Sequence, residues 1–179
     1  SGKAIGIPGE HQSKRVHRLA HAMNQFLGNI DRTVFHTDPV EADPTDQFAS
    51  LRDLVRSMEA GSVDTLLILG GNPVYTTPVD LNFADALTKV KLRIHLGLYN
   101  DETAFLCHWH IPEAHFLESW SDGRAYDGTL SILQPLIAPL YDGKTSHELL
   151  AAFTNRPDRS SYEILRDYWR RNWPGAAVR

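Results

Sequence analysis

A glycine-rich loop is the first feature of this sequence that could carry chemistry. Gly70-Gly71-Asn72-Pro73 directly follows the apolar run Thr65–Leu69. In an open α/β sheet, ligands bind beyond the carboxyl ends of the strands, and glycines there let the backbone approach a phosphate or a pterin-like group closely. The alternative is a tight turn whose glycines only relieve positive φ, because short Gly-rich loops are weak motifs. The residues alone leave both interpretations open.

A second polar loop follows the next predicted strand, Leu92–Leu96. Its Asn100 or Asp101 could hydrogen-bond a nucleotide base or sugar. Helix capping is an equally good role for them, because Asn and Asp satisfy free N–H groups at helix starts. Since both loops follow strands, we expect them to frame one crevice. The predicted cofactor-binding residues are Gly70, Gly71, Asn72, Pro73, Asn100, Asp101, Glu102 and Thr103.

A group of metal-ligating residue types lies within nine positions: Cys107, His108, His110 and His115. In an extended segment, His108 and His110 share one face while Cys107 lies on the other, so the four do not converge as a tetrahedral set. Unpatterned His clusters are also weak signals of a metal site. We therefore predict no metal site in this segment.

Support for an active site within the chain is weak. There is no Gly-x-Ser-x-Gly motif and no Cys-His pair in a usual catalytic context. Glu113 and Glu118 could act as acid or base, but a single glutamate near a turn is usually solvated. His17 and His21 lie one helical turn apart without a third ligand nearby, which favours a surface position. We predict no catalytic residue, and no complete active site, in this chain.

The elements that must position the two loops follow a βα pattern. Short apolar runs alternate with helical stretches, which predicts a Rossmann-like α/β fold, a mostly parallel sheet with helices on both faces. Thr65–Leu69 is continuously apolar, as expected for a central strand buried on both sides. After about residue 109, glycines and prolines predict an irregular, hairpin-containing excursion. The predicted strands are Ala4–Ile7, Thr33–Phe35, Thr65–Leu69 and Leu92–Leu96; the predicted helices are Lys14–Leu27, Thr45–Ala60, Leu81–Val90, Thr103–Leu106, Ser146–Phe153 and Ser160–Arg171.

Composition excludes several classes of partner. The formal net charge is -4, which gives no electrostatic reason to bind nucleic acid. Cys107 is the only cysteine, so this chain alone cannot ligate an iron–sulfur cluster, which usually takes four cysteines. No apolar run approaches the roughly 20 residues that span a bilayer, so we expect no direct membrane insertion. The Arg- and Trp-rich last helix is either a partner-docking surface or an ordinary amphipathic helix.

Taken together, several segments resemble the molybdopterin oxidoreductase family, which includes dimethyl sulfoxide reductases and formate dehydrogenases. Leu66–Pro73 resembles the strand and the Gly-x-Asn-Pro loop of that family. Further along the chain, the family has a Glu-Thr-Ala, Leu-Pro and Glu series, and the segments here that resemble it are Asp101–Ala104, Ile111-Pro112 and Glu118. The resemblance is closest to one branch, the iron–sulfur subunit of alternative complex III. That branch is suggested by Pro8-Gly9-Glu10-His11-Gln12 and by His17, Leu19, Ala20, His21, Asn24, Leu27, Gly28 and Asn29.

The resemblance implies a fold, a cofactor and partners. The two loops would correspond to the place where catalytic relatives hold the guanine dinucleotide end of molybdopterin guanine dinucleotide. Members that bind the cofactor usually have Ala-Asp before the Leu-Pro pair, whereas this chain has Cys107-His108. Because that difference removes a carboxylate and inserts bulk, we expect a cofactor-free structural domain. The alternatives are part of a working molybdoenzyme and a stand-alone nucleotide-binding module.

The resemblance also implies a longer protein. We expect residues 1–155 to form a fragment of a molybdopterin-oxidoreductase-type domain, and residues 156–179 to form a helix and tail that lead to a further region. Any iron–sulfur clusters would lie in that region. The expected partners are other subunits of a membrane-bound quinol oxidoreductase complex in a respiratory chain. The expected location is peripheral, on the periplasmic side of the bacterial inner membrane.

Overall fold

The computed structural model describes residues 2–41 and 43–172, which fall into two compact units. The smaller unit comprises the described residues up to 41 together with 125–129. The larger unit comprises the described residues from 43 to 124 and from 130 onward, and it contains the whole parallel sheet. Both predicted loops therefore belong to the larger unit.

The smaller unit is built on helix α1 (Lys14–Phe26), which confirms the predicted helix to within one residue. The predicted strand Ala4–Ile7 is wrong. Gly6 N–H donates to Asn24 Oδ1, and Asn24 Nδ2 donates to the Gly6 carbonyl, both at 2.8 Å. A side-chain carboxamide therefore satisfies this extended backbone in place of a neighbouring strand.

The second predicted strand of the smaller unit, Thr33–Phe35, is also wrong. The structure has only an isolated bridge there, between Ile30 and Val34. A turn closed by Asp31, which has φ +60°, brings these two residues together. The segment therefore pairs with itself, and β-branched composition alone did not make it a strand.

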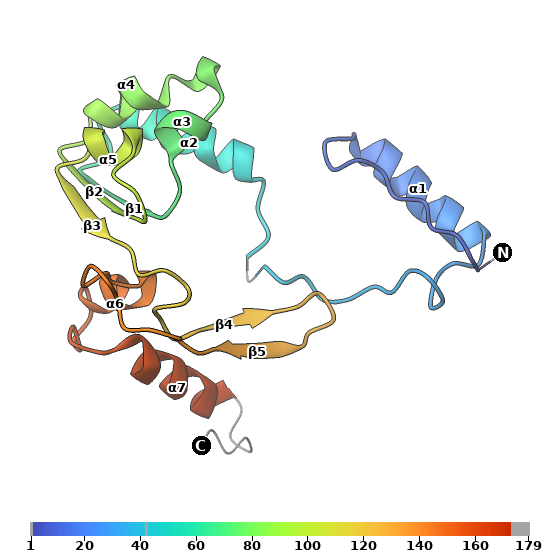
Figure 1. The fold of residues 1–179 in the computed structure, drawn as a ribbon. Helices are drawn as coiled ribbons and strands as arrows, with labels where there is room; N and C mark the ends of the chain where they lie inside the picture. The colour runs from blue at the N-terminus through green and yellow to red at the C-terminus, as the bar shows by residue number, and fades with distance from the viewer. Residues whose placement is uncertain (1, 42, 173–179) are drawn as a thin grey trace. The chain divides into compact units, whose positions relative to one another are not determined.

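The larger unit contains a three-stranded parallel sheet of β1 (Thr65–Leu69), β2 (Leu92–Gly97) and β3 (Trp109–Pro112), in the order β1-β2-β3 (Figure 1). The predictions of β1 and β2 are confirmed. Strand β1 is an edge strand of this sheet, so its predicted central position is wrong. Strand β3 was not predicted, because its four residues include Trp109 and His110 in a stretch that lacks a continuous apolar run.

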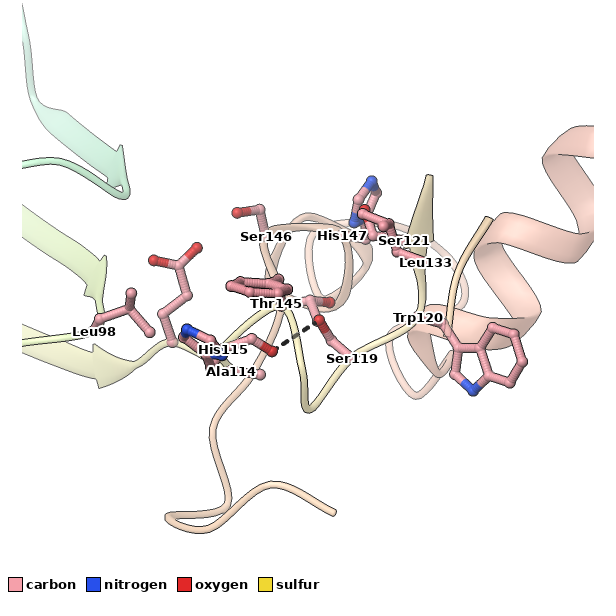
Figure 2. Close-up of a pocket in the computed structure, with 12 residues that line it drawn as sticks. Leu98, Ala114, His115, Ser119, Trp120, Ser121, Leu133, Thr145, Ser146 and His147 are labelled. Carbon is pink, nitrogen blue, oxygen red and sulfur yellow. Dashed lines mark hydrogen bonds between the residues drawn. The ribbon is translucent and has the colours of Figure 1, made fainter. Parts of the chain in front are cut away.

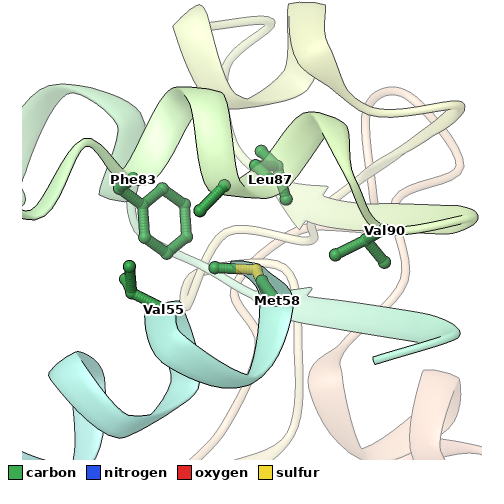
Figure 3. Close-up of a cluster of buried hydrophobic side chains, with 6 residues drawn as sticks. Val55, Met58, Phe83, Leu87 and Val90 are labelled. Atoms are coloured by element: carbon green, nitrogen blue, oxygen red, sulfur yellow. The ribbon is translucent and has the colours of Figure 1, made fainter. Parts of the chain in front are cut away.

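One face of the sheet is covered by α2 (Gln47–Glu59) and α4 (Phe83–Thr88), whose buried side chains form the main core (Figure 3). Leu66 and Ile68 of β1 pack against this cluster. The predicted helix at Thr45–Ala60 begins later than expected, because Asp46 is the N-cap and accepts the Ala49 N–H at 2.9 Å. The core residues are Val55, Met58, Phe83, Ala86, Leu87 and Val90.

Short helices follow the strands at the carboxyl edge of the sheet. Helix α3 (Pro73–Thr76) follows β1, and α5 (Glu102–Leu106) follows β2, as predicted from Thr103. The predicted helix Leu81–Val90 is shorter in the structure. A 3-10 turn η1 (Val79–Leu81) comes first, and Asn82 with φ +45° separates it from α4.

The remaining elements confirm the hairpin and the two last helices. Strands β4 (Ser121–Arg124) and β5 (Leu130–Leu133) are antiparallel, and α6 (Ser146–Ala151) and α7 (Ser161–Asn172) follow. Ile111, which alternates to the sheet face opposite His110, lines a hollow with Leu149 and Ala152 of the α6 segment. The predicted α/β class is therefore confirmed.

Among the described residues, none of the helices combines the length and the apolar character that a bilayer span requires.

Candidate functional site

The two predicted loops lie side by side at the carboxyl edge of the sheet, as expected from parallel strands β1 and β2. Asn72 joins them through both ends of its carboxamide. Its Nδ2 donates to Glu102 Oε2 at 2.6 Å, and its Oδ1 accepts the Thr103 hydroxyl at 2.8 Å. The two predicted loops are therefore joined directly, and we call the edge that they form, residues 70–73 and 100–103, the rim. Of the eight predicted residues, only Asn100, Asp101 and Glu102 line the hollow there.

Thr103 completes the connection between the loops. Its side chain is buried, and its Oγ1 accepts the Val74 N–H of α3 at 3.0 Å while it donates to Asn72. Asp101 is the N-cap of α5 and accepts the Ala104 N–H at 2.9 Å, so the capping role left open for it is present. The bond from Asn72 is the main cause that lowers the pKa of Glu102, with the Glu102 backbone N–H contributing next.

Gly70 and Gly71 supply a backbone that other residues rarely adopt. Their φ angles are +70° and +71°, in the region where only glycine avoids a steric penalty. The Gly70 N–H donates to the Leu96 carbonyl at 2.8 Å, which extends the sheet by one bond, and Pro73 then starts α3. The glycines therefore provide the positive φ angles that the tight-turn interpretation requires.

Two histidines at the rim were not predicted as site residues. His95 of β2 is completely buried, and its Nε2 lies 3.1 Å from the Gly71 carbonyl oxygen. His110 of β3 places its Nδ1 3.2 Å from His95 Nδ1. The parallel register pairs His95 with His110. A sequence signal existed, because both residues interrupt apolar strands at positions facing the same side of the sheet.

The ionisable groups around these two histidines are carboxyl groups. Asp101 Oδ1 lies 3.9 Å from His95 Nδ1. Burial is the main cause that lowers the pKa of His110, and the neighbouring His95 lowers it further. Burial also raises the pKa of Glu113, whose Oε2 lies close to Gly70. Three carboxyl groups, those of Asp101, Glu102 and Glu113, therefore lie at or beside the rim together with the two imidazoles, and the environment of His110 favours its neutral form.

The hollow at this rim does not fit a dinucleotide cofactor. It measures about 500 Å³, and its lining includes Asp101 and Glu102 but neither lysine nor arginine. A pyrophosphate needs positive countercharge or a cluster of N–H donors, whereas these carboxylates repel it. Guanine and ribose donors would meet suitable acceptors here, but the whole cofactor would not. The lining residues are Val74, Asn100, Asp101, Glu102, Phe105 and Leu106.

The Cys107-His108 pair does not belong to this rim, which corrects an inference drawn from the sequence. His108 N–H donates to the Arg93 carbonyl at 2.9 Å, and Arg93 N–H donates to His108 Nδ1 at 3.1 Å. Both residues lie where β2 and β3 begin, at the amino edge of the sheet. The difference from cofactor-binding members therefore removes no carboxylate from the crevice.

The four metal-ligating residue types of the segment 107–115 lie in separate environments. Burial is the main cause that raises the pKa of Cys107, and His108 is engaged with Arg93. His110 faces His95, and His115 Nδ1 accepts the Leu117 N–H at 3.3 Å. In the part of the chain that the structure describes, no group of three or more potential ligands is arranged to hold a metal ion.

A second hollow of about 500 Å³ lies beyond β3, where it is lined by His115, Ser119, Trp120, Thr145, Ser146 and His147, among others (Figure 2). Two of its polar side chains make hydrogen bonds that hold the local backbone. Ser119 Oγ donates to the His115 carbonyl, and Thr145 caps α6. Glu118 accepts N–H groups of His115 and Leu140, so it ties a loop and is not a free acid or base.

Comparison with known proteins supports the resemblance to a molybdopterin oxidoreductase-like family. No family model matches the chain. The chain is 32% identical over 102 residues to the molybdopterin-binding-like subunit of menaquinone reductase from Nitratidesulfovibrio vulgaris, covering 55% of this chain and 15% of that protein. It is 27% identical over 136 residues to the alpha subunit of an NADPH-Fe(3+) oxidoreductase from Geobacter sulfurreducens, covering 75% of this chain and 16% of that protein. The chain thus spans about one sixth of the length of these relatives.

Proposed function

We propose that this chain is a cofactor-free, molybdopterin-family-type structural domain within a respiratory electron-transfer subunit. Residues 1–155 would form the domain fragment, and residues 156–179 would lead toward a region that carries iron–sulfur clusters. The observation that carries the proposal is the acidic rim. The two loops are adjacent, as the resemblance implies, but the hollow between them is lined by Asp101 and Glu102 and by no lysine or arginine that could neutralise a pyrophosphate.

The internal bonds of the rim support the same conclusion. The Asn72 carboxamide is engaged by Glu102 and by Thr103 at its two ends, so its polar atoms hold the loops together. Of the eight predicted cofactor-binding residues, Asn72, Glu102, Thr103 and Asp101 all have partners within the protein. We therefore propose that the eight residues shape the rim and do not hold a cofactor.

Exposed aromatic side chains near the rim support a role in protein–protein contact. Tyr75, Tyr99 and Phe105 are 76%, 77% and 84% exposed, and they lie on the segments that carry the two loops. Aromatic residues are enriched at protein–protein interfaces, where they anchor the contact. We propose that this surface contacts another subunit, or another part of the same subunit, in the assembled complex.

The wider setting is proposed from the relatives. One relative is named as a subunit of a menaquinone reductase and another as a subunit of an NADPH-Fe(3+) oxidoreductase. For this chain we propose a quinol oxidoreductase complex of the alternative complex III type, with a peripheral position on the periplasmic side of the bacterial inner membrane. Other subunits of that complex would be its partners.

The rival function is a share in a working molybdoenzyme, in which this chain would contribute half of a dinucleotide site. The carboxylates of the rim favour it in one respect, because carboxylates bind ribose hydroxyls in dinucleotide folds. A third candidate, a stand-alone nucleotide-binding module, rests only on the βα pattern. Both alternatives require this rim to accept a phosphorylated nucleotide.

Thermal unfolding of this chain with GDP, ADP or guanosine separates these functions. We expect no stabilisation by any of the three, because the rim offers the phosphates no countercharge. A ligand at a hundred times its Kd would raise the free energy of unfolding by about 2.7 kcal/mol. Stabilisation by GDP but not by guanosine would show that the rim binds phosphate, and the proposal would then be wrong.

A further inference from the structure

The His95–His110 pair is a feature that the proposed function does not use. His95 is completely buried on the central strand, and its ring occupies the space above Gly97. A Cβ atom at Gly97 would lie only 2.6 Å from His95 Cε1. The ring is therefore held in one position by the backbone beneath it and by the Gly71 carbonyl beside it.

The partners of the two rings define where their protons lie. A carbonyl oxygen only accepts, so His95 Nε2, 3.1 Å from the Gly71 oxygen, carries a proton. Neutral His95 then has its lone pair on Nδ1. Because His110 Nδ1 lies 3.2 Å from that atom, His110 must donate from Nδ1 and keep its own lone pair on Nε2.

The charged groups that face the pair come from two elements beyond the histidines. Asp101, at the start of α5, places Oδ1 3.9 Å from His95 Nδ1. Glu113, directly after β3, interacts electrostatically with His95. Both carboxyl groups stabilise a positive charge on His95, whereas His110 is more exposed than its partner and its Nε2 does not bond to another described residue.

We propose that His95 and His110 form a proton-binding site that takes up one proton at the partly exposed His110 ring and stores its charge on the buried His95 ring. A proton from solvent adds to His110 Nε2. The N–H bond at His110 Nδ1 then breaks as a new N–H bond forms at His95 Nδ1. His110 ends neutral with its proton on Nε2, and its Nδ1 accepts from the imidazolium of His95.

The positive charge on His95 would change the electrostatic potential at the rim. The His95 Nε2–H bond to the Gly71 carbonyl persists in both states, so the loop stays anchored while the charge beneath Asp101 and Glu113 changes by one unit. A second proton cannot be held in this geometry, because both Nδ1 atoms would then carry hydrogens pointing at each other. The pair therefore titrates as one coupled unit.

Imidazole ¹⁵N spectra of this chain test the proposal through the tautomers. At high pH we expect His95 as the Nε2–H tautomer and His110 as the Nδ1–H tautomer. On acidification the His95 ring becomes doubly protonated while His110 changes to its Nε2–H tautomer. A His110 ring that is Nε2–H at high pH, or that titrates alone while His95 stays neutral, would overturn the proposal.

The variant His110→Gln provides a second test. The carboxamide can donate to His95 Nδ1 and preserve the fold, but it has no basic nitrogen and so cannot switch tautomer. In the unmodified chain the backbone amides of Gly71 and Asn72 should shift with pH as the pair titrates, and His110→Gln should change the midpoint of that shift, because a rotated carboxamide replaces the imidazole as the acceptor for His95 Nδ1–H. His147→Gln, an exposed histidine of α6, should leave it unchanged. An unchanged midpoint in His110→Gln would refute the proposal, and the tautomer spectra decide the question if that variant does not fold.

Discussion

At the carboxyl edge of the sheet, Asn72 binds two residues of the neighbouring loop through opposite ends of one carboxamide. The sequence predicted that Asn72 and Thr103 belong to one site, because both follow parallel strands. It could not predict that they bond to each other, since the direction of a side chain depends on local backbone angles such as φ +71° at Gly71. The sequence equally missed His95, whose neighbours come from three segments.

Replacing Asn72 by alanine should destabilise the chain. The buried Thr103 hydroxyl loses its acceptor and Glu102 loses its donor, which together should lower the free energy of unfolding by about 2 kcal/mol. Asn100→Ala is the matched control, because Asn100 is exposed on the same rim and should change it by less than about 0.5 kcal/mol. Urea unfolding of the two variants measures the difference, and equal stabilities would contradict the role given to Asn72.

Glu113 should make stability fall as pH rises. Burial raises its pKa from the ordinary value of 4.5, so the folded chain binds this proton more tightly than the unfolded chain. Its favourable contribution is therefore complete below pH 4.5 and is lost as pH rises through the folded pKa. Glu113→Gln should flatten this part of the curve and gain stability relative to the unmodified chain near neutral pH. Unfolding measured from pH 4 to 8 checks the sign.

At the scale of the elements, the sequence predicted the helices better than the strands. Lys14–Phe26 and Gln47–Glu59 have apolar residues at three- and four-residue spacing, a long-range pattern that a few substitutions do not hide. Strands of four or five residues carry less pattern. Ala4–Ile7 has strand-like residues but no partner strand, whereas β3 has a partner strand but no continuous apolar run. Strand pairing is a tertiary property, so it was not readable from either segment.

Strand β2 ends at Gly97, where the absence of a side chain leaves room for the His95 ring. Gly97→Ala would place a methyl group against the His95 ring, and the resulting overpacking should lower the free energy of unfolding by roughly 1–3 kcal/mol. Gly123→Ala in β4 is the matched control, since its Cβ would meet no atom within 4 Å and should be nearly neutral. If thermal unfolding places both variants at the same midpoint, the close contact between His95 and Gly97 is not present.

At the scale of the whole molecule, the βα pattern of the sequence predicted the α/β class and the adjacency of the two loops. The sequence did not reveal that Cys107 and His108 lie at the opposite edge of the sheet from the rim, where α5 (Glu102–Leu106) ends and β3 begins. The domain boundary at residue 155 stays a prediction. The case for a cofactor-free domain accordingly depends on the acidic rim and no longer on that residue pair.

Elemental and pterin analysis of the intact parent protein, purified within its complex, tests this conclusion most directly. We predict neither molybdenum nor tungsten, and no pterin released on denaturation, even where iron is abundant. Stoichiometric molybdenum or tungsten together with a pterin guanine dinucleotide would contradict it.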